Sequence, residues 1–210
     1  MGVKGIIGKK LGMTQIFTPE GKSVPVTVIE AGPCVVVQKK SPERDGYDAV
    51  QLGFRDVGEK KATKPRAGHF KKANITIKKH LKEFRLAGAS EMSVGDTVNA
   101  DVFADGDRVD VTGITKGHGF SGGVKRWGLH MQSHTHGVGP VHRHSGSMGA
   151  NSDPSRIMKN KKMPGQYGNE QVTILNLDVI KVDGDKNLIA IRGAVPGARN
   201  GIVFIRKTVK

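Results

Sequence analysis

The chain has little of several things that common protein classes need. Cys34 is its one cysteine, so no disulfide can form within the chain, and aromatic residues make up 5% of it. No run approaches the ~20 apolar residues of a membrane-spanning helix, and residues 1–10 lack the apolar stretch of a signal peptide. These absences predict an intracellular, soluble protein with a core of Val, Ile and Leu. Because Cys34 lies in the apolar run Gly-Pro-Cys-Val-Val-Val, we expect a buried, inert thiol.

Acidic residues are scarce in two segments, which together hold the whole positive charge of the chain. The 34 Lys and Arg against 19 Asp and Glu give a net charge of +15. Residues 59–85 contain ten basic and two acidic residues, residues 114–168 contain eight and one, and the remainder is neutral. Polyphosphate is the commonest partner that neutralises such a charge. An anionic membrane is the rival, but the sequence has neither an amphipathic basic helix nor a lipid anchor.

The neutral remainder has the pattern of short β-strands. Apolar residues alternate or form short runs, and Gly, Asp and Asn turns such as 183–185 separate them. This pattern predicts a small barrel or a sandwich. Pro25 predicts that its strand lies at an edge or a bulge. The expected strands are 24–29, 35–37, 47–54, 98–103, 109–111, 172–182, 188–191 and 202–205.

The two basic segments differ in character. Near the end of 59–85, Ile77, Leu81 and Phe84 have the i, i+4, i+7 spacing of a short helix with a basic outer face, which either binds a partner or is merely solvated. Residues 113–168 contain twelve glycines and isolated apolar residues, so they cannot form a core of their own. A loop of this length is functional or disordered. Glycine lets a chain approach phosphates closely, and Trp, His and Arg planes stack on bases, which favours RNA binding.

Three motifs in the second segment point to other functions but lack what those functions need. Residues 117–122 match G-x-G-x-x-G, but no helix follows and the next acid is Asp153. The pairs of histidines at 134–136 and 142–144 have zinc-like spacing, but carboxylates that would orient them are scarce. No serine lies on a nucleophile elbow. We therefore expect no enzyme activity, catalytic residue, cofactor, metal or small-molecule substrate, and we expect the histidines to contact phosphates, 2′-hydroxyls or bases.

Several strings in the chain resemble the bacterial large-subunit ribosomal protein number three family, and the resemblance runs from end to end. They are GIIGKKLGMTQIF at 5–17, VPVTVIEAGP at 24–33, DGYDAVQLGF at 45–54, KPRAGHF at 64–70, VDVTGITKG at 109–117, GVKRW at 123–127 and GAVPG at 193–197.

The resemblance implies more than the residues themselves indicate. It implies a mainly β protein with a small closed β-barrel core, residues 1–114 plus 169–210, and a basic helical insertion at about 59–85. It also implies a long, irregular, glycine-rich extension, 115–168, that penetrates the rRNA and approaches the peptidyl transferase region. The protein would be cytoplasmic, in the ribosome, would support early assembly of the large subunit, and would contact rRNA and neighbouring ribosomal proteins but no membrane.

The chain departs from the family pattern inside the extension. Ser145 stands where a proline is usual, and His144 stands where an arginine is usual. Some relatives carry a modified glutamine where this chain has Ala150, so that modification cannot occur there. Thr135 precedes His136-Gly137 in place of the usual serine, and Asn160 replaces a glycine between two lysines. These changes affect the expected contacts of the tip.

The candidate rRNA-binding residues are the cations, imidazoles and indole of the two basic segments. They are Lys64, Arg66, Lys71 and Lys72 in the insertion and Lys116, His118, Lys125, Arg126, Trp127, His134, His136, His142, Arg143, His144, Arg156, Lys159, Lys161 and Lys162 in the extension. Two alternatives are a DNA-binding protein and a nucleic-acid-modifying enzyme. No recognition-helix motif supports the first, and no catalytic constellation supports the second.

Overall fold

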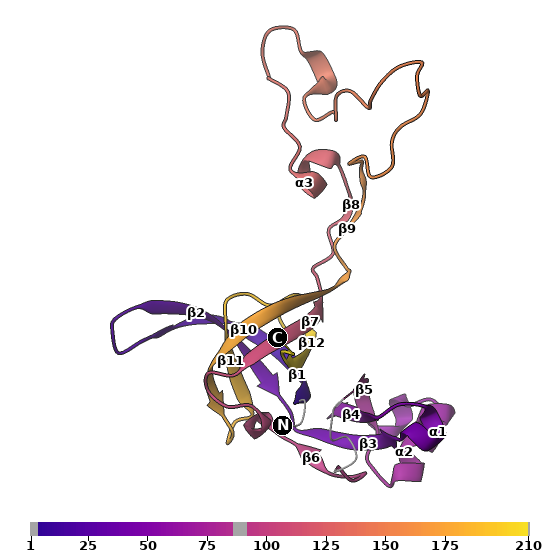
Figure 1. Cartoon of the computed structure of the whole chain (residues 1–210), viewed down its shortest axis with the longest axis vertical. Coiled ribbons are helices and arrows are strands. Elements are labelled where there is room, and N and C mark those ends of the chain that lie inside the picture. The colour runs from indigo at the N-terminus through magenta and orange to yellow at the C-terminus, as the bar shows by residue number, and fades with distance from the viewer. Residues whose placement is uncertain (1–3, 86–91, 210) are drawn as a thin grey trace. The chain divides into compact units, whose positions relative to one another are not determined.

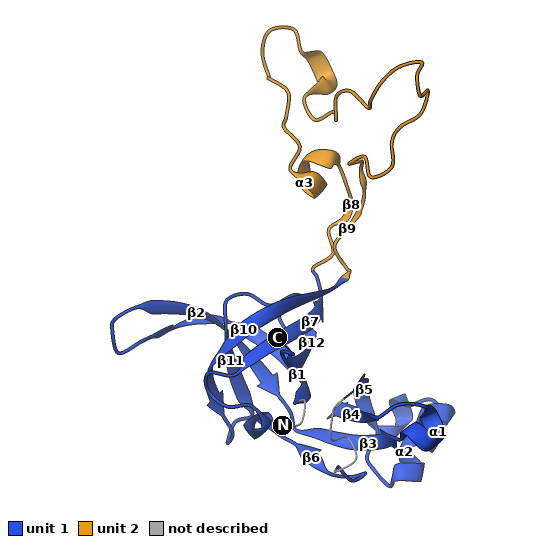
Figure 2. Ribbon diagram, in the orientation of Figure 1, with its two compact units in different colours: residues 1–115, 171–210 blue, residues 116–170 orange. Residues whose placement is uncertain are grey.

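The protein is described here by a computed structural model that covers residues 4–85 and 92–209 (Figure 1). The chain divides into two compact units (Figure 2). Unit 1 contains residues 1–115 and 171–210, and unit 2 contains residues 116–170. In the described residues, no helix has the length and apolarity to cross a membrane.

Unit 1 is built on a closed antiparallel β-barrel of six strands, in the order β1-β12-β7-β10-β11-β2. This confirms the prediction of a mainly β protein with a small barrel. The strands are β1 (Gly5–Phe17), β2 (Ser23–Ala31), β7 (Arg108–Ile114), β10 (Gln171–Asp183), β11 (Leu188–Arg192) and β12 (Ile202–Lys207).

The barrel forms because its strands alternate aliphatic residues with others. Val203 and Ile205 on β12 and Ile189 and Ile191 on β11 are 0% exposed, and the residues between them are partly exposed. This period of two directs one face of each strand inward. Burying each such side chain stabilises the fold by roughly 1.5–3 kcal/mol.

Pro25 lies at an edge, as predicted. Pro25 pairs with Gln15 of β1, whereas the ladder between β2 and β11 begins one residue later, at Val26. Proline has no N–H to donate to a ladder, so it fits just beyond the ladder between β2 and β11, where its carbonyl oxygen accepts a hydrogen bond of 2.8 Å from the N–H of Gly193.

Two parts of unit 1 differ from the sequence-based expectation. Strand β1 was not predicted, because its glycines make packing surfaces instead of supplying side chains: a side chain at Gly8 would collide with Ile29. The expected strand at 98–103 is wrong beyond its first residue. Strand β6 (Thr97–Val98) ends there, and the 3-10 turn η3 (Ala100–Val102) follows. Ala100 and Phe103 are both buried because residues three apart share a face in a 3-10 turn.

A second sheet in unit 1 has the order β5-β4-β3-β6 and carries the basic insertion. Its longer strands are β3 (Cys34–Lys40), β4 (Ala49–Asp56) and β5 (Lys78–Phe84). Around them lie the one-turn helix α1 (Pro42–Asp45), the 3-10 turn η1 (Glu59–Lys61) and helix α2 (Lys64–Ala73). Val36, Val50, Leu52 and Phe54 join one core with the barrel residues. Cys34 is fully buried in it, as expected, and burial raises the pKa of its thiol to about 12.

The insertion is helical, but the helix does not lie where the spacing of Ile77, Leu81 and Phe84 predicted it. Residues 78–84 form the strand β5 instead. The inward positions of this strand include Lys78, whose side chain is buried while its Nζ reaches Asp56 at 2.8 Å. A lysine stem that replaces an aliphatic residue hides the alternation. The helix is α2, which has a proline in its first turn and ends at Asn74 in the left-handed conformation, φ 54°.

Unit 2 contains little regular structure. A two-stranded ribbon joins β8 (Gly119–Ser121) to β9 (Gly165–Tyr167). Helix α3 (Gly123–Trp127) follows β8, and the 3-10 turn η4 (Gly139–Val141) lies in the loops beyond it. The rest is irregular, which confirms the predicted glycine-rich extension.

Candidate nucleic-acid interface

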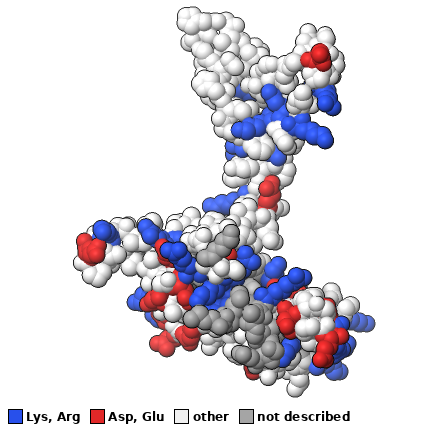
Figure 3. Space-filling view, viewed as in Figure 1, with Lys and Arg blue, Asp and Glu red and all other residues white. Residues whose placement is uncertain are grey.

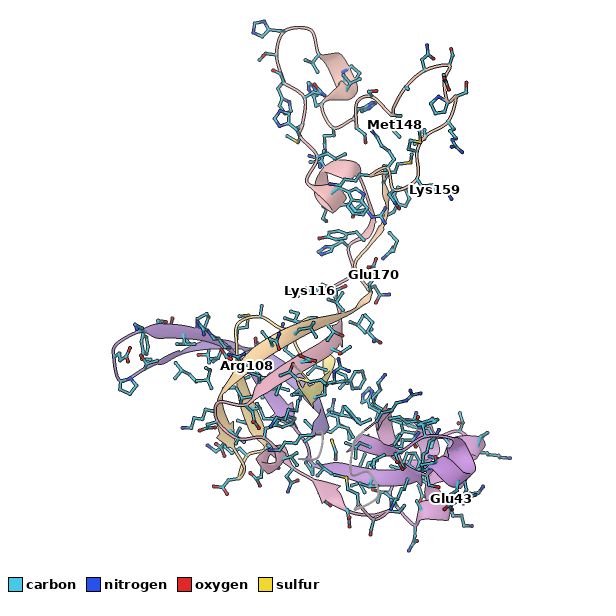
Figure 4. The ribbon with its side chains drawn as sticks, in the orientation of Figure 1. Glu43, Arg108, Lys116, Met148, Lys159 and Glu170 are labelled. Carbon is cyan, nitrogen blue, oxygen red and sulfur yellow. The ribbon has the colours of Figure 1, made fainter. Side chains whose placement is uncertain are left out.

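At the base of unit 2, the outgoing and the returning segments of the chain lie close together. Lys116 and Glu170, the first and last residues of the unit, lie there (Figure 4). Gly168 has φ +70°, and a side chain at this position would collide with the carbonyl oxygen of Lys116. The two strands can therefore approach this closely because glycine occupies the crossing. Above it, β8 and β9 pair in the register Gly119↔Tyr167 to Ser121↔Gly165.

Helix α3 is fastened to the returning chain through one carbonyl group. Arg126 Nη1 donates a hydrogen bond of 3.0 Å to the Met163 oxygen, and Trp127 Nε1 donates one of 2.9 Å to the same oxygen. The Arg126 guanidinium also lies 4.8 Å from the centre of the Trp127 ring. Arg126 occupies the space that a side chain at Gly165 would need. Trp127 is therefore oriented by its neighbours and remains 42% exposed.

Aromatic rings lie at the surface around this ribbon. His118 stacks on Tyr167 with ring centroids 4.8 Å apart. Phe120, in β8, is 80% exposed. Exposed aromatic rings held on a paired backbone can act as stacking platforms for bases. Sequence reasoning missed Phe120 and Tyr167. The usable signal for Phe120 was its position between a glycine and a serine, with no apolar partner at strand or helix spacing.

The structure brings together two of the five histidines in the far loops. His134 and His142 stack with centroids 4.4 Å apart and an interplanar angle of 20°. His142 Nδ1 lies 2.9 Å from the Ser133 carbonyl oxygen, to which its N–H donates. Among the described residues, no group of three or more His, Cys, Asp or Glu side chains has the arrangement of a metal site.

Nearly all of the candidate residues of unit 2 are accessible. Arg126 and His142 are half-buried, and the other twelve are exposed. Lys and Arg gather over α3 and the returning chain near Lys159, whereas the farther loops carry few of them (Figures 3 and 4). The farther loops carry imidazoles instead.

Residues 116–170 are all described, and they bury no large apolar side chain. Their buried residues are Ser121, Gly123 and Gly168. The unit therefore holds its shape through hydrogen bonds, ring contacts and glycine crossings rather than through a hydrophobic core.

The four candidate residues of the insertion lie on α2. Lys64, Lys71 and Lys72 are exposed, and Arg66 is half-buried. Phe70 is the buried residue that fixes this helix on the sheet. A surface hollow of about 590 Å³ beside α2 is lined by Lys39, Arg44, His69 and Lys72 and by one acid, Asp45. The insertion thus presents cations on a scaffold that is packed on a hydrophobic core.

A polar network at the edge of the second sheet supports the insertion. Lys40 Nζ donates to the Tyr47 hydroxyl at 2.9 Å and pairs with Glu83 at 2.9 Å, while Tyr47 donates to Glu83 at 3.1 Å. The hydrogen bond to Tyr47, followed by that to Glu83, raises the pKa of Lys40. The hydrogen bond from Lys40 lowers the pKa of Glu83. Arg85 covers the Tyr47 ring at 4.5 Å.

The sequence matches a known family over the region that includes all of unit 2. The family described as "Ribosomal protein L3" matches residues 85–188, about half of the chain. The matched region includes β7, the entire extension and β10. The end-to-end resemblance of the motifs and the closed barrel agree with this match. The chain therefore belongs to the ribosomal protein L3 family and is a structural protein of the large ribosomal subunit.

Proposed function

We propose that the protein binds large-subunit rRNA directly, through unit 2 and through α2 of the insertion. The observation that carries this proposal is the composition of unit 2. It has eight Lys and Arg residues, exposed aromatic rings and no buried large apolar side chain. A segment that displays cations and rings without a core of its own is suited to an environment of phosphates and unpaired bases.

The proposal assigns separate roles to the two parts of the chain. The core domain, 1–114 plus 169–210, supplies a folded anchor, and the extension 115–168 enters the rRNA. By the family resemblance, the protein supports early assembly of the subunit in the cytoplasm, lies beside other large-subunit proteins, and its extension approaches the peptidyl transferase region. It performs no catalysis.

Removal of unit 2 tests the binding role. Ile114 and Gln171 are paired neighbours on β7 and β10, so a two-residue Asn-Gly turn can replace residues 115–170 and close a hairpin. We expect this variant to keep the melting transition of the barrel, and to leave large subunits at a much lower salt concentration than the full chain does. Co-sedimentation with large subunits across a salt series measures this. Equal retention of both proteins would contradict the role of unit 2.

The position of the extension can be tested with a tethered cleavage reagent. Cys34 is buried and unreactive, so a cysteine introduced by Ser147→Cys is the single reactive thiol of the chain. An iron chelate attached there, in assembled subunits, should cleave rRNA near the peptidyl transferase region. The matched control, Asp185→Cys in the turn between β10 and β11, should cleave elsewhere. The same cleavage pattern from both positions would contradict the proposal.

A further inference from the structure

A second basic hollow lies at the insertion, and Arg66 is the one candidate residue from the sequence that it includes. It has a volume of about 410 Å³ and is lined by Arg55, Asp56, Val57, Gly58, Lys61, Arg66 and Lys79. We call this the basic hollow. Four of its seven residues are cations, and they come from four elements: β4, η1, α2 and β5. Such convergence differs from the solvated face of one helix, where like charges are spread along a single element.

The one acid of the basic hollow is already neutralised. Asp56 Oδ1 accepts hydrogen bonds of 2.8 Å from Lys78 Nζ and 2.8 Å from Thr76 Oγ1. The bond from Lys78, followed by that from Thr76, lowers the pKa of Asp56. Among the residues that the structure describes, no carboxylate lies within ion-pair distance of Arg55, Lys61, Arg66 or Lys79. The four cations therefore lack a protein counter-charge in this part of the chain.

One of the four cations is held by the backbone, and a second has an unusual backbone conformation. Arg66 Nη2 donates to the carbonyl oxygens of Lys78 and Lys79, which fixes its guanidinium against β5 and leaves its other N–H groups available. Arg55 has φ +60°, a left-handed conformation that disfavours side chains. Within the described part of unit 1, every other non-glycine residue with positive φ is an asparagine. Backbone strain at a residue with a long, exposed side chain is typical of ligand clamps.

The positive charge of these cations affects the pKa of the neighbouring His80. Burial lowers the pKa of His80, and Lys79, Arg55 and Arg66 lower it further. These three residues lie on its own strand, on β4 and on α2. An anion in the basic hollow would offset their charge, so the pKa of His80 would rise toward its ordinary value.

We propose that the basic hollow binds one phosphate group of an RNA backbone, with Arg66 as the oriented donor and Arg55, Lys61 and Lys79 as the surrounding positive charges. This inference rests on the proposed rRNA binding for the source of the phosphate, but the hollow itself is argued from its own residues. Its chemistry would also accept free inorganic phosphate. The insertion then binds the RNA backbone through residues that β4, β5, η1 and α2 hold in place, independently of unit 2.

The first experiment tests whether the hollow takes phosphate. In the full chain, a pH titration of the His80 ring signals by NMR is recorded with and without inorganic phosphate. We expect phosphate to raise the pKa of His80 in the wild type and not in Arg55→Gly, which removes a cation where glycine is conformationally favoured. No change in the wild type, or the same change in Arg55→Gly, would overturn the proposal.

The second experiment tests the source of the phosphate with a pair of variants of equal charge. Lys61→Gln with Lys79→Gln removes two cations of the hollow. The control, Lys181→Gln with Lys186→Gln, removes two exposed cations from β10 and the turn after it. Against a large-subunit rRNA fragment, we expect the hollow variant to bind roughly 10-fold more weakly at physiological salt. Its slope of log affinity against log salt should be smaller by about 1, while the control is unchanged.

The outcomes separate the two proposals. If the wild type binds rRNA and the hollow variant keeps both its affinity and its salt slope, the hollow does not contact RNA and rRNA binding still stands. If the wild type binds no rRNA, the proposed function fails, and the phosphate titration of His80 alone decides whether the hollow binds an anion. If phosphate shifts His80 and the rRNA fragment does not compete for the site, the assignment to an RNA backbone is overturned in favour of free phosphate.

Discussion

Units 1 and 2 differ in where their apolar side chains lie. The buried hydrophobic residues of the described chain, 25 in number, all belong to unit 1. Unit 2 buries Ser121, Gly123 and Gly168, and leaves Phe120 80% exposed. The same chain therefore contains a part that is stabilised by apolar burial and a part that is held by a few polar and ring contacts.

This difference indicates which interactions stabilise each unit. Apolar burial is the dominant favourable term in folding, whereas an exposed hydrogen bond contributes roughly 0.5–1.5 kcal/mol at most. We infer that unit 1 folds without RNA and that unit 2 becomes fully ordered when RNA supplies its missing contacts. Five measurements test this difference between the two units.

The largest difference is expected in amide exchange of the free protein. Core amides of the barrel should exchange through global unfolding, which requires roughly 5–15 kcal/mol in domains of this kind. Most amides between residues 120 and 165 should exchange without such protection. Hydrogen–deuterium exchange followed by mass spectrometry measures both at once. Slow exchange throughout 120–165 would show that unit 2 is ordered by itself.

A core truncation should distinguish the units by stability. Ile205 is fully buried in β12, so Ile205→Ala should reduce the free energy of unfolding by roughly 2–5 kcal/mol. Val141 is 39% exposed in unit 2, so Val141→Ala should change it by about 0.5 kcal/mol or less. Urea denaturation gives both values. Equal losses would mean that unit 2 contributes to the cooperative core.

Trp127 should affect assembly more than stability. Trp127→Ala removes the hydrogen bond to Met163 and an indole that we expect to face RNA, and base stacking is worth roughly 1–3 kcal/mol. We expect a nearly unchanged melting temperature and weaker incorporation into large subunits. Trp127→Phe keeps a ring and should recover part of the loss. A large fall in melting temperature with normal incorporation would instead assign Trp127 to the core.

Two lysines of unit 2 should contribute to the salt dependence of binding. Lys161→Gln with Lys162→Gln should reduce the slope of log affinity against log salt by about 1 to 2. Each phosphate contact that is lost changes this slope by about 0.7–0.9, because fewer counterions are released on binding. Both lysines are exposed, so the stability of unit 1 should not change. The Lys181 and Lys186 double variant serves again as the control. An unchanged slope would mean that these two lysines do not touch phosphate.

The smallest effect is expected from His80 in unit 1. Its pKa is lowered in the folded protein from an ordinary value of 6.5, by burial and by Lys79, Arg55 and Arg66. The unfolded chain therefore takes up a proton first as the pH falls, and stability is lost below about pH 6.5. His80→Gln should flatten the decline of the unfolding free energy between pH 7 and pH 5.5. A decline identical in both proteins would show that another group causes it.

The sequence predicted best where local pattern and burial agree. The strands β2, β10, β11 and β12 alternate aliphatic residues with others, and they were predicted. Strand β5 was mistaken for a helix because Lys78 takes an inward position. Strand β1 was missed because Gly5 and Gly8 meet the side chains of Phe84 and Ile29 instead of supplying their own.

The candidate site shows the same limit. The cations of unit 2 are close in sequence, so charge counting found them. Charge counting also found the segment 59–85, which holds three cations of the basic hollow, but it could not show that these three converge with Arg55, because strand pairing between β4 and β5 and the position of α2 bring them together. No linear pattern connects Arg55 with Lys79. The left-handed backbone of Arg55 is equally a product of the folded chain.

The order of strands in the barrel has a consequence for synthesis of the chain. Strand β12, which is made after every other strand of the barrel, lies between β1 and β7, and its residues pair with Gly5–Lys9, which come much earlier in the sequence. The barrel therefore cannot close until residues 202–207 have left the ribosome that makes them. By then the whole of unit 2 has already emerged. Pairing of strands that are so far apart in the sequence is a slow, non-local step. The basic segments of a nascent chain are therefore exposed before its barrel closes.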